Sequence, residues 1–457
     1  MDKSAEKAAQ KIFDRILVDI KPSAEEIQDT TFKVNKLTNM LAQTVPKNVE
    51  VRVAGSMARG TNLKGDADID MFLLFPSGFS NERLVKLGLE YGKKLVKKEK
   101  GRYEIKYAEH PYIRLYLDSI GVKADIVPAS KIEDAQDMKT AVDRTPLHTE
   151  FINSSLTSRQ RDEVRMLKYL LKAHGIYGAE VKTGGFSGYM CELLIHHYGS
   201  LSKALDSVSK FKLPLIIEPR FKNEIHDEDL SRRFNSDFVV IDPVDKTRNA
   251  AAGVSHESLG RFVIVARQFV KKPSIDLFYR NRFSSTKVRG LLSKFLTNSG
   301  LDTFLIESKL PDKSEDITFP QLRKMGRLIV DHLERNGFSV YLSMPVTNGR
   351  RGIILLMAPK QILKSRMLKG PNVFVEDASH RFMEKHKGAM GFTVVDLVLY
   401  ALEKSKYQDI KSVLRDLPSR LRSHKDINLS NAKVLVNKMP KELAVDVYAE
   451  ILKKTTI

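Results

Sequence analysis

Residues 55–72 read GSMARGTNLKGDADIDMF, and the predicted fold of the N-terminal region follows from them. Residues 49–53, just before this stretch, alternate apolar and polar side chains, as a half-buried strand does. Gly55-Ser56 then breaks the alternation, and a second strand-like run covers residues 69–75. The stretch therefore predicts a strand, a tight turn, a short helix, a loop and a second strand.

Asp68 and Asp70 are the first candidate functional residues in this stretch. They are two positions apart, so on a strand both carboxylates leave the same face, roughly 7 Å apart at about 3.3 Å per residue. Adjacent carboxylates repel each other unless a cation neutralises them. Mg²⁺ typically takes one or two carboxylates together with substrate phosphates, and Ser56 with the amides that begin the short helix is suited to hold phosphate oxygens. The stretch thus predicts a nucleotidyl-transfer site; the alternative is a solvated loop or a salt-bridged strand end.

A third carboxylate, Asp125, interrupts the apolar segment GVKADIVPA at residues 121–129. The alternating apolar residues of this predicted strand share one face, and Asp125 points to the other. A charge in such a strand needs a partner. One interpretation is a salt bridge to Lys123 or another nearby lysine, and the other is the third carboxylate of a metal-binding triad with Asp68 and Asp70.

The composition is that of a basic protein without a disulfide framework. The chain of 457 residues, long enough for about three domains, has 76 Lys and Arg against 56 Asp and Glu, which gives a net charge of +20. Its pI is about 9.6. This surplus is expected of a protein that holds a polyanion, although a basic surface without a partner is the alternative. The single cysteine, Cys191, excludes an internal disulfide and a Cys-based zinc site, and is consistent with a reducing compartment.

Two further features bear on location. The first twenty residues, MDKSAEKAAQKIFDRILVDI, have the pattern of a charged amphipathic helix and not of a signal peptide. No window approaches about eighteen uninterrupted apolar residues, the length that spans a membrane. We therefore expect a cytoplasmic protein without a membrane partner.

Periodicity predicts secondary structure along the whole chain. The predicted helices cover residues 4–19, 22–44, 81–98, 147–156, 158–174, 188–198, 286–296, 319–336 and 429–454, with one more after an N-cap at Ser255. The predicted strands cover residues 49–53, 69–75, 103–108, 112–117, 122–127, 211–218, 238–242, 302–307, 338–343 and 352–357. The early strands and helices indicate a mixed sheet with packed helices, and the elements after residue 271 suggest a ferredoxin-like α+β unit.

Three segments carry a family resemblance. The chain resembles the DNA-polymerase-β-like nucleotidyltransferases, and closely the archaeal (class I) CCA-adding enzymes, which complete the 3′ end of tRNA. The resemblance lies in the segments GSMARGTNLKGDADIDMFLLF, RMLKYLLKAHGIYG and GFSGYMCELLI. The resemblance covers roughly residues 45 to 270. It implies an α+β fold with a polymerase-β-like nucleotidyltransferase head at 1–150 and a helical nucleotide-binding neck at 151–270. A C-terminal tRNA-binding portion, ferredoxin-like and helical, is expected at 271–457.

The resemblance places Asp125 with Asp68 and Asp70 as ligands of Mg²⁺. Two ions about 3.5–4 Å apart would be shared by the pair, with Asp125 on the metal at the attacking side. Asp125 is also a candidate general base for the tRNA 3′-hydroxyl.

The resemblance further implies nucleotide-binding residues, which are Ser56, Arg59, His148, Lys168, Tyr177 and Arg248. A histidine in the segment TPLHTEFI, here His148, contacts the nucleotide in the family. Lys168 and Tyr177 would bind the triphosphate as a point charge and a hydroxyl donor. Arg248, in the DPxxxxRNxA segment, would read the nucleobase. The alternatives are a capping histidine, a solvated lysine, a packing tyrosine and a surface arginine.

Basic clusters recur in the last third of the chain, at residues 280–282, 287–289, 349–351 and 415–425. Each alone is typical of a solvated basic face. Together with the net charge they fit a docking surface for the phosphates of the tRNA acceptor arm.

The predicted reaction is attack of a tRNA 3′-hydroxyl on the α-phosphate of CTP, twice, and then of ATP, with release of pyrophosphate and without a template. Catalysis by positioning and charge neutralisation needs no covalent intermediate. The alternatives are a related poly(A) or oligoadenylate polymerase, a small-molecule nucleotidyltransferase, and an RNA-binding protein with a degenerate site. The sequence leaves open how the pocket changes from CTP to ATP, which C-terminal residues contact tRNA, and the oligomeric state, for which a homodimer is one alternative.

Overall fold

A computed structural model describes residues 3–451 apart from 67, 108–109, 221–231, 280–284, 348–350, 431 and 438–450. The chain divides into two compact units, Met1–Arg282 and Phe283–Thr456, which are described separately. All of the candidate catalytic and nucleotide-binding residues lie in the first unit. Within the described ranges, no helix is both long enough and apolar enough to cross a bilayer.

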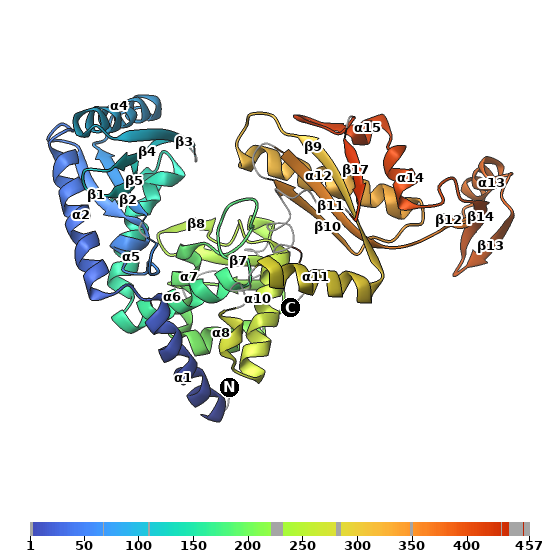
Figure 1. Ribbon diagram of the computed structural model, residues 1–457, viewed down its shortest axis with the longest axis horizontal. Helices are drawn as coiled ribbons and strands as arrows, with labels where there is room; N and C mark the ends of the chain where they lie inside the picture. Colours follow the sequence, from blue (N-terminus) through green and yellow to red (C-terminus); the bar gives the residue numbers. More distant parts are fainter. Residues whose placement is uncertain are drawn as a thin grey trace. The chain divides into compact units, whose positions relative to one another are not determined.

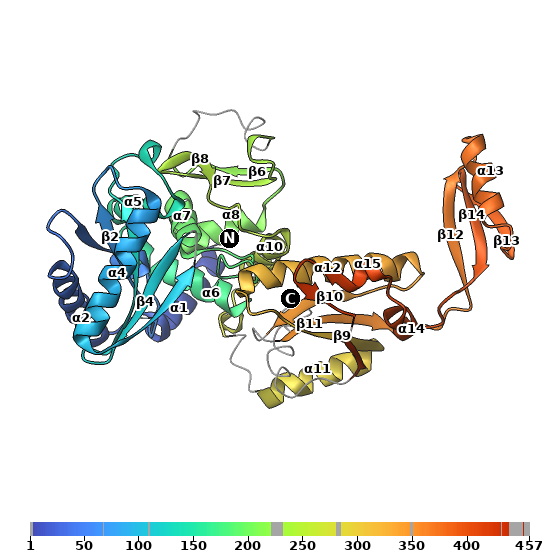
Figure 2. The ribbon, with the colours of Figure 1, turned by 90° about the horizontal axis from the view of Figure 1, so that it is seen from above.

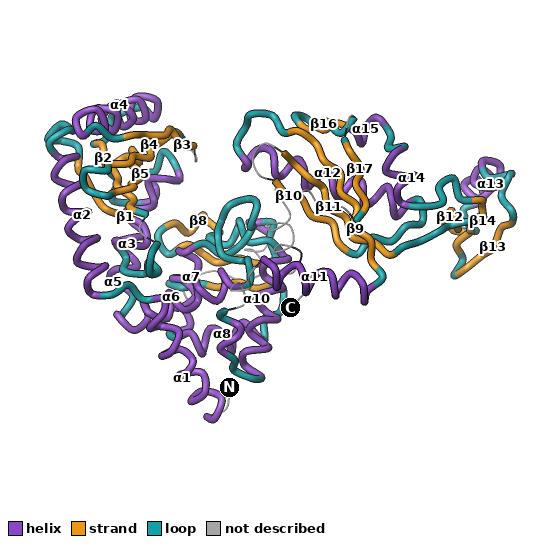
Figure 3. Tube along the Cα trace, viewed as in Figure 1, coloured by secondary structure: helices purple, strands orange, loops and turns teal. Residues whose placement is uncertain are grey.

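A mixed five-stranded sheet forms the N-terminal part of the first unit (Figures 1 and 3). Its strands are β1 (Glu50–Ala54), β2 (Ile69–Phe75), β3 (Arg102–Tyr107), β4 (Pro111–Leu117) and β5 (Val122–Ser130). Their order in the sheet is β1-β2-β5-β4-β3; β2 and β5 are parallel, and the other neighbouring strands are antiparallel. The four-residue helix α3 (Gly55–Ala58) follows β1 directly, so the predicted strand, turn, helix and strand are confirmed.

Two helices, α2 (Ala24–Ala42) and α4 (Asn81–Glu99), cover one face of this sheet. Each begins at a serine N-cap, Ser23 for α2 and Ser80 for α4. Leu41 of α2 and Leu95 of α4 are fully buried in the same core as alternate residues of β2 and β5. Because side chains alternate along a strand, the odd residues of β2 enter this core and Asp70 points to the opposite face.

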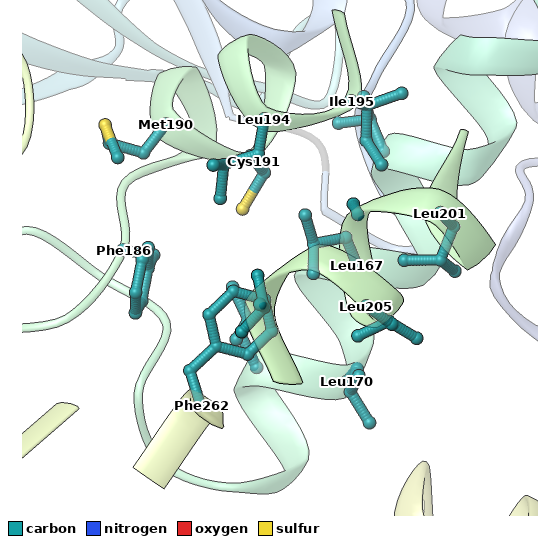
Figure 4. Close-up of a cluster of buried hydrophobic side chains, with 14 of the residues drawn as sticks. Leu167, Leu170, Phe186, Met190, Cys191, Leu194, Ile195, Leu201, Leu205 and Phe262 are labelled. Atoms are coloured by element: carbon teal, nitrogen blue, oxygen red, sulfur yellow. The ribbon is translucent and has the colours of Figure 1, made fainter. Parts of the chain in front are cut away.

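A second core lies among helices and contains the buried face of the predicted neck (Figure 4). Its helices are α5 (Arg144–Ser155), α6 (Ser158–Ala173), α7 (Gly188–Tyr198), α8 (Leu201–Ser209) and α10 (His256–Lys271). The first helix of the chain, α1 (Lys3–Ile20), also packs its apolar face, including Phe13 and Ile16, into this core. Short 3-10 turns cover Ala135–Asp137, Ala141–Asp143 and Ile275–Leu277.

A small sheet joins this helical core. Its strands are β6 (Leu215–Ile217), β7 (Phe238–Asp242) and β8 (Asp245–Asn249), in the order β6-β7-β8. β7 and β8 form an antiparallel hairpin, and β7 is buried throughout. This hairpin brings the DPxxxxRNxA segment into a fixed position.

The second unit contains a four-stranded antiparallel sheet with the order β10-β11-β9-β17. Its elements are α11 (Ser285–Ser299), β9 (Leu301–Lys309), α12 (Glu315–Arg335), β10 (Leu342–Thr347), β11 (Arg351–Pro359), α14 (Ile410–Arg415), α15 (Ser419–Arg422), β15 (Ser423–His424), β16 (Ile427–Asn428) and β17 (Lys433–Val436). The order of strands and helices is that of a ferredoxin-like fold, which confirms the prediction. Figure 2 shows α12 on one face of the sheet and α11 on the other.

A smaller module is inserted between β11 and α14. It consists of β12 (Ser365–Asn372), α13 (Glu376–Lys385), β13 (Gly391–Val395) and β14 (Val398–Lys404), with α13 against the sheet β12-β14-β13 (Figure 2).

The structure also differs from the predicted elements. The predicted helix at 429–454 is wrong for residues 433–436, which form β17, because Lys-Val-Leu-Val alternates and pairs with β9; residues 438–450 lie outside the described residues. The strand predicted at 211–218 is limited to β6, and β10 begins later than predicted. Of the basic clusters, residues 280–282 and 349–350 also lie outside the described residues.

Candidate active site

Asp70 and Asp125 are direct neighbours in the sheet. In the parallel register of β2 and β5, Asp70 pairs with Asp125, and on the other side Asp70 pairs with Ala54 at the end of β1. Residues paired in this way project from the same face. Asp68 is two residues before Asp70, immediately ahead of β2. The predicted third carboxylate therefore lies beside the pair and not away from it.

Two of the three carboxylates are held by basic residues. Arg114 Nε and Nη2 donate to the two oxygens of Asp125, both at 2.6 Å, and Lys123 Nζ lies 2.7 Å from Asp68 Oδ1. Asp125 therefore forms a salt bridge, as one of the two interpretations of the sequence predicts, but its partner is Arg114 and not a lysine. Among the described residues, no three His, Cys, Asp or Glu side chains converge closely enough to hold a metal ion. In this arrangement Arg114 and Lys123 neutralise Asp125 and Asp68, which relieves the repulsion among the three carboxylates.

The pKa of Asp70 is shifted by its surroundings. Burial, followed by the charges of Asp125 and Asp68, raises the pKa of Asp70 to about 6, while Arg59 and Arg114 oppose this shift. An aspartate in such surroundings is ionised at a cost that a nearby cation offsets.

Gly55 brings the start of α3 against this carboxylate. Its φ of +73° lies in the left-handed region, and a Cβ at this position would be 2.0 Å from Asp70 Oδ2. Only glycine permits both the conformation and the approach. Ser56 follows directly and is partly buried, so the predicted phosphate-binding segment adjoins Asp70.

Arg59 and Lys168 meet at a carboxylate that sequence reasoning missed. Arg59 Nε donates to Glu192 Oε1 at 3.0 Å, and Lys168 Nζ lies 3.8 Å from the same oxygen. Thr61 joins them, because Lys168 Nζ donates to its carbonyl and hydroxyl oxygens at 3.0 and 3.1 Å, and its hydroxyl donates to Glu192 Oε1 at 2.5 Å. All four side chains are buried. Burial lowers the pKa of Lys168, and Glu192 opposes that shift.

Tyr177 lies close to Lys168. A Cβ at Gly188, the first residue of α7, would be 3.2 Å from Tyr177 Oη and 3.3 Å from Lys168 Nζ, so both polar ends flank one point. Burial raises the pKa of the Tyr177 hydroxyl, which therefore remains a hydrogen-bond donor at neutral pH.

His148 and Arg248 are joined by a second missed carboxylate, Asp242 at the end of β7. His148 Nε2 lies 2.8 Å from Asp242 Oδ2, Arg248 Nη1 donates to the same oxygen at 2.7 Å, and the Tyr189 hydroxyl donates to Oδ1 at 3.0 Å. The ring of His148 stacks on Tyr189 with centroids 3.9 Å apart. Burial alone would raise the pKa of Asp242, but the partners His148 and Arg248 lower it to about 2. Burial lowers the pKa of His148, with Asp242 opposing it.

A pocket of about 670 Å³ borders Arg248. It is lined by Arg144, Ala179, Gly185, Ser187, Met190, Phe234, Asn235, Ser236, Asp245, Thr247, Arg248, Asn249, Ala250, Ala252, Gly253 and Val254. The lining comes mainly from β8 and the residues on either side of the β7–β8 hairpin, with Arg144 of α5 and residues around the start of α7, so it offers a concave surface on the side of the predicted base-reading arginine.

Arg59 connects these groups. Its guanidinium influences the pKa of Asp70, of His148, and of the pair Lys168 and Tyr177. Arg59 therefore lies within electrostatic range of predicted residues from both the head and the neck, and its ion pair with Glu192 connects the two. Glu192 interrupts the apolar run MCELLI and Asp242 ends the apolar strand FVVID; a lone acid in an apolar run was the signal by which both could have been found.

Three family models match successive parts of the chain. A nucleotidyltransferase domain matches residues 34–148, the second domain of tRNA nucleotidyltransferases matches residues 162–279, and the C-terminal domain of CCA-adding enzymes matches residues 300–428.

Curated relatives extend over most of the chain. The CCA-adding enzyme of Methanocaldococcus jannaschii is 34% identical over 93% of this chain and 95% of that protein. The CCA-adding enzyme of Pyrococcus abyssi is 33% identical over 95% and 96%, and that of Archaeoglobus fulgidus is 38% identical over 72% and 71%. Among solved structures, the Cid1 poly(U) polymerase with Mg and 3′-dATP bound has a TM-score of 0.48 and 16% identity, and the match covers 59% of this chain and 97% of that chain.

The polymerase-β-like fold class predicted from the sequence agrees with the matched nucleotidyltransferase domain. Nucleotidyltransferases of this superfamily generally use a divalent metal ion. Since relatives with more than 30% identity align with nearly the full chain, and the C-terminal model is specific to these enzymes, the chain is a nucleotidyltransferase and belongs to the CCA-adding enzyme family.

Proposed function

We propose that this protein adds C, C and A to the 3′ end of tRNA, with CTP and ATP as donors and pyrophosphate as the leaving group. The observation that carries the proposed mechanism is the register of β2 and β5, in which Asp70 lies beside Asp125 and two residues from Asp68. The tRNA nucleotidyltransferase and CCA-adding models matched along the chain support tRNA as the acceptor. The single free cysteine, Cys191, supports a reducing, cytoplasmic location.

Asp68, Asp70 and Asp125 are the proposed ligands of Mg²⁺. The chemistry of the donor set suits this ion, although the three side chains do not converge in the present arrangement: Asp70 is partly buried and lies beside two further carboxylates, and burial together with their charges raises its pKa. Bound Mg²⁺ supplies positive charge to the α-phosphate and to the leaving pyrophosphate. Asp68 and Asp125 would give up Lys123 and Arg114 to take this role, and Asp125 would accept the proton of the attacking 3′-hydroxyl.

Arg59, Lys168 and Tyr177 are the proposed triphosphate ligands, with Ser56. Arg59 and Lys168 supply two buried cations against one carboxylate, Glu192, so an excess of positive charge faces the phosphates. The Tyr177 hydroxyl, which adjoins Lys168, donates a further hydrogen bond. Buried charge of this kind favours an anion more strongly than the same charges in water would.

Arg248 and His148 are the proposed contacts to the nucleoside. Asp242 fixes one nitrogen of Arg248, whose side chain is 34% exposed, and leaves other guanidinium nitrogens to donate to acceptors on cytosine or adenine. His148 is held against Tyr189 and Asp242, which keeps its ring in one orientation. The pocket next to Arg248 offers space for a base.

The test uses tRNA that lacks its last three nucleotides, incubated with Mg²⁺ and labelled CTP or ATP. We expect incorporation of two C and then one A, with no addition to an unstructured RNA of equal length. The Asp68→Ala variant is expected to lose incorporation while its thermal unfolding stays close to that of the wild type, because Asp68 is exposed. A run of A without prior C would instead identify a poly(A)-type polymerase, and wild-type incorporation by Asp68→Ala would contradict the proposed metal site.

A further inference from the structure

Glu192 is a fully buried carboxylate with two cations around a single oxygen. Its exposed fraction is 0%, and its Oε1 lies 3.0 Å from Arg59 Nε and 3.8 Å from Lys168 Nζ. Thr61 donates its hydroxyl to the same oxygen. The second oxygen, Oε2, is buried and has no hydrogen-bond partner among the residues that the structure describes. A buried carboxylate with one oxygen unpaired is costly, so its retention calls for a reason beyond packing.

The contacts of Glu192 connect segments that are far apart in sequence. Arg59 and Thr61 lie in the connection from α3 to β2, between Ser56 and Asp68. Lys168 comes from α6, and Glu192 comes from α7. One side chain therefore ties the phosphate-binding segment of the head to two helices of the helical core.

We propose that Glu192 is a positioning residue for the triphosphate, which holds Arg59 and Lys168 together around one buried oxygen. The inference rests on the proposed function, because it assigns the two cations to the phosphates of CTP and ATP. Two like charges in a buried site repel each other and are each destabilised by the loss of water. A single carboxylate between them offsets both costs and leaves a net positive charge for the substrate.

The protonation of Lys168 supports this role. Burial lowers the pKa of Lys168, Glu192 raises it, and Arg59 lowers it further. Without the carboxylate, Lys168 would lose its proton at a lower pH, and the triphosphate would lose a charged partner.

The other charged or titratable groups that face Lys168 do not account for a change in CTP binding with pH. Besides Glu192, they are Arg59 from the segment after α3, Arg165 from α6, Cys191 from α7 and the Tyr177 hydroxyl. Burial raises the pKa of the Cys191 thiol to about 12 and also raises the pKa of Tyr177. Both arginines keep their charge between pH 7 and 9. A pH dependence of CTP binding that appears in a Glu192 variant and not in the wild type is therefore attributable to Lys168.

The first test is equilibrium binding of CTP and of CMP to the full-length protein between pH 7 and 9, for the wild type and Glu192→Gln. We expect the affinity of the variant for CTP to fall as pH rises, on the order of tenfold or more relative to the wild type at pH 9. Binding of CMP, which lacks the terminal phosphates, should change little. Equal affinity of the two proteins for CTP at every pH would overturn the inference, as would equal, pH-independent losses for CTP and CMP, which indicate a merely structural role.

Glu163→Gln is a matched control. Glu163 is a buried glutamate of the same helical core, and it pairs with Arg159 and the Leu201 amide, away from Arg59 and Lys168. The same isosteric change there should leave the pH profile of CTP binding unchanged. If Glu163→Gln produces the same pH-dependent loss, the inference about Glu192 is wrong.

Thr61→Val keeps the test decisive if Glu192→Gln does not fold. This change removes the hydroxyl that joins Lys168 to Glu192 and leaves both charges in place. We expect weaker CTP binding with the pH profile of the wild type, and unchanged CTP binding would overturn the inference. Failure of the proposed function is distinguishable, because in that case the wild-type protein itself would not bind CTP.

Discussion

Asp70 differs from the other two carboxylates of the proposed metal site. Asp68 and Asp125 are each paired with a basic residue, whereas the pKa of Asp70 is raised to about 6 by burial and by those two neighbours. A carboxyl whose pKa is higher in the folded than in the unfolded state favours folding at low pH. Its contribution is lost as pH rises through the folded value. At neutral pH, ionised Asp70 therefore costs stability, and a cation bound at the proposed site would offset that cost.

Asp70→Asn removes this cost. In the presence of a chelator at pH 7.5, we expect the variant to be more stable than the wild type, by up to about 3 kcal/mol. The difference should shrink toward pH 4, where the wild-type carboxyl is protonated. Thermal unfolding at both pH values measures this, and Asp68→Asn, at an exposed position, should show no comparable gain. A variant that is less stable than the wild type at pH 7.5 would contradict the assignment of Asp70.

Gly55 and Gly65 form a matched pair. Both have φ near +70°, at +73° and +72°, but a Cβ at Gly55 would be 2.0 Å from Asp70 Oδ2, and a Cβ at Gly65 would meet nothing within 4 Å. Alanine at Gly65 should cost about 1 kcal/mol of stability from backbone strain alone, with activity kept. Alanine at Gly55 should cost about 1–3 kcal/mol more and lower nucleotide incorporation by at least about tenfold, since Asp70 must move. If the two alanine substitutions had equal effects on unfolding and equal effects on nucleotide incorporation, the close approach of Gly55 to Asp70 would not be required.

At the scale of elements, the strands that bear the carboxylates were predictable and the hairpin that holds Arg248 was not. β2 and β5 are runs of apolar residues in which an acid stands out, so both the strands and their acids could be identified. β8 reads Asp-Lys-Thr-Arg-Asn, whose polar residues carry no strand period; it is a strand because it pairs with the buried β7. The helix predicted through residues 433–436 failed for the same reason, since pairing with β9 decides the structure there.

The residues of the candidate site also fall into those that local sequence could identify and those that it could not. A motif fixes spacing along one element, so Asp68 with Asp70 could be located from local sequence. Glu192 and Asp242 act through residues more than ninety positions away, Arg59 and His148, and no local pattern reports those contacts. Arg114, the partner of Asp125, is likewise set by the register of β4 against β5.

Asp242→Asn tests the link between the β7–β8 hairpin and the helices. The carboxylate accepts from Tyr189, Arg248 and the Val244 amide and contacts His148, and its pKa is lowered to about 2. Its contribution is present above the unfolded value and is lost as pH falls toward the folded one. We therefore expect Asp242→Asn to lower the free energy of unfolding by about 2–3 kcal/mol at pH 7 and to have no effect near pH 2. Urea unfolding at both pH values measures this difference.

The same variant should bind nucleotides less selectively. With Arg248 no longer fixed, KM for CTP and ATP should rise by about tenfold or more, and discrimination against UTP should fall. Unaltered stability at pH 7, or unaltered discrimination in competition assays, would count against Asp242 as the residue that holds Arg248.

For the whole molecule, the charge of +20 predicts a strong electrostatic contribution to tRNA binding. Several neutralised phosphates make the affinity for tRNA fall about 10³-fold or more between 50 and 200 mM salt. CTP carries fewer charges, so its affinity should fall less over the same range. Titrations of both ligands at several salt concentrations check this; a tRNA affinity that is insensitive to salt would exclude a phosphate-binding surface.

The position of the bound metal ion is the sharpest test of the proposed active site. Mn²⁺ accepts the same oxygen ligands as Mg²⁺, so a crystal of the protein with CTP and Mn²⁺ locates the ion by anomalous diffraction. We expect Mn²⁺ bound by Asp68, Asp70 and Asp125, with the pairs Lys123–Asp68 and Arg114–Asp125 opened. Mn²⁺ at another place, with both pairs intact and CTP remote from Asp70, would contradict this expectation.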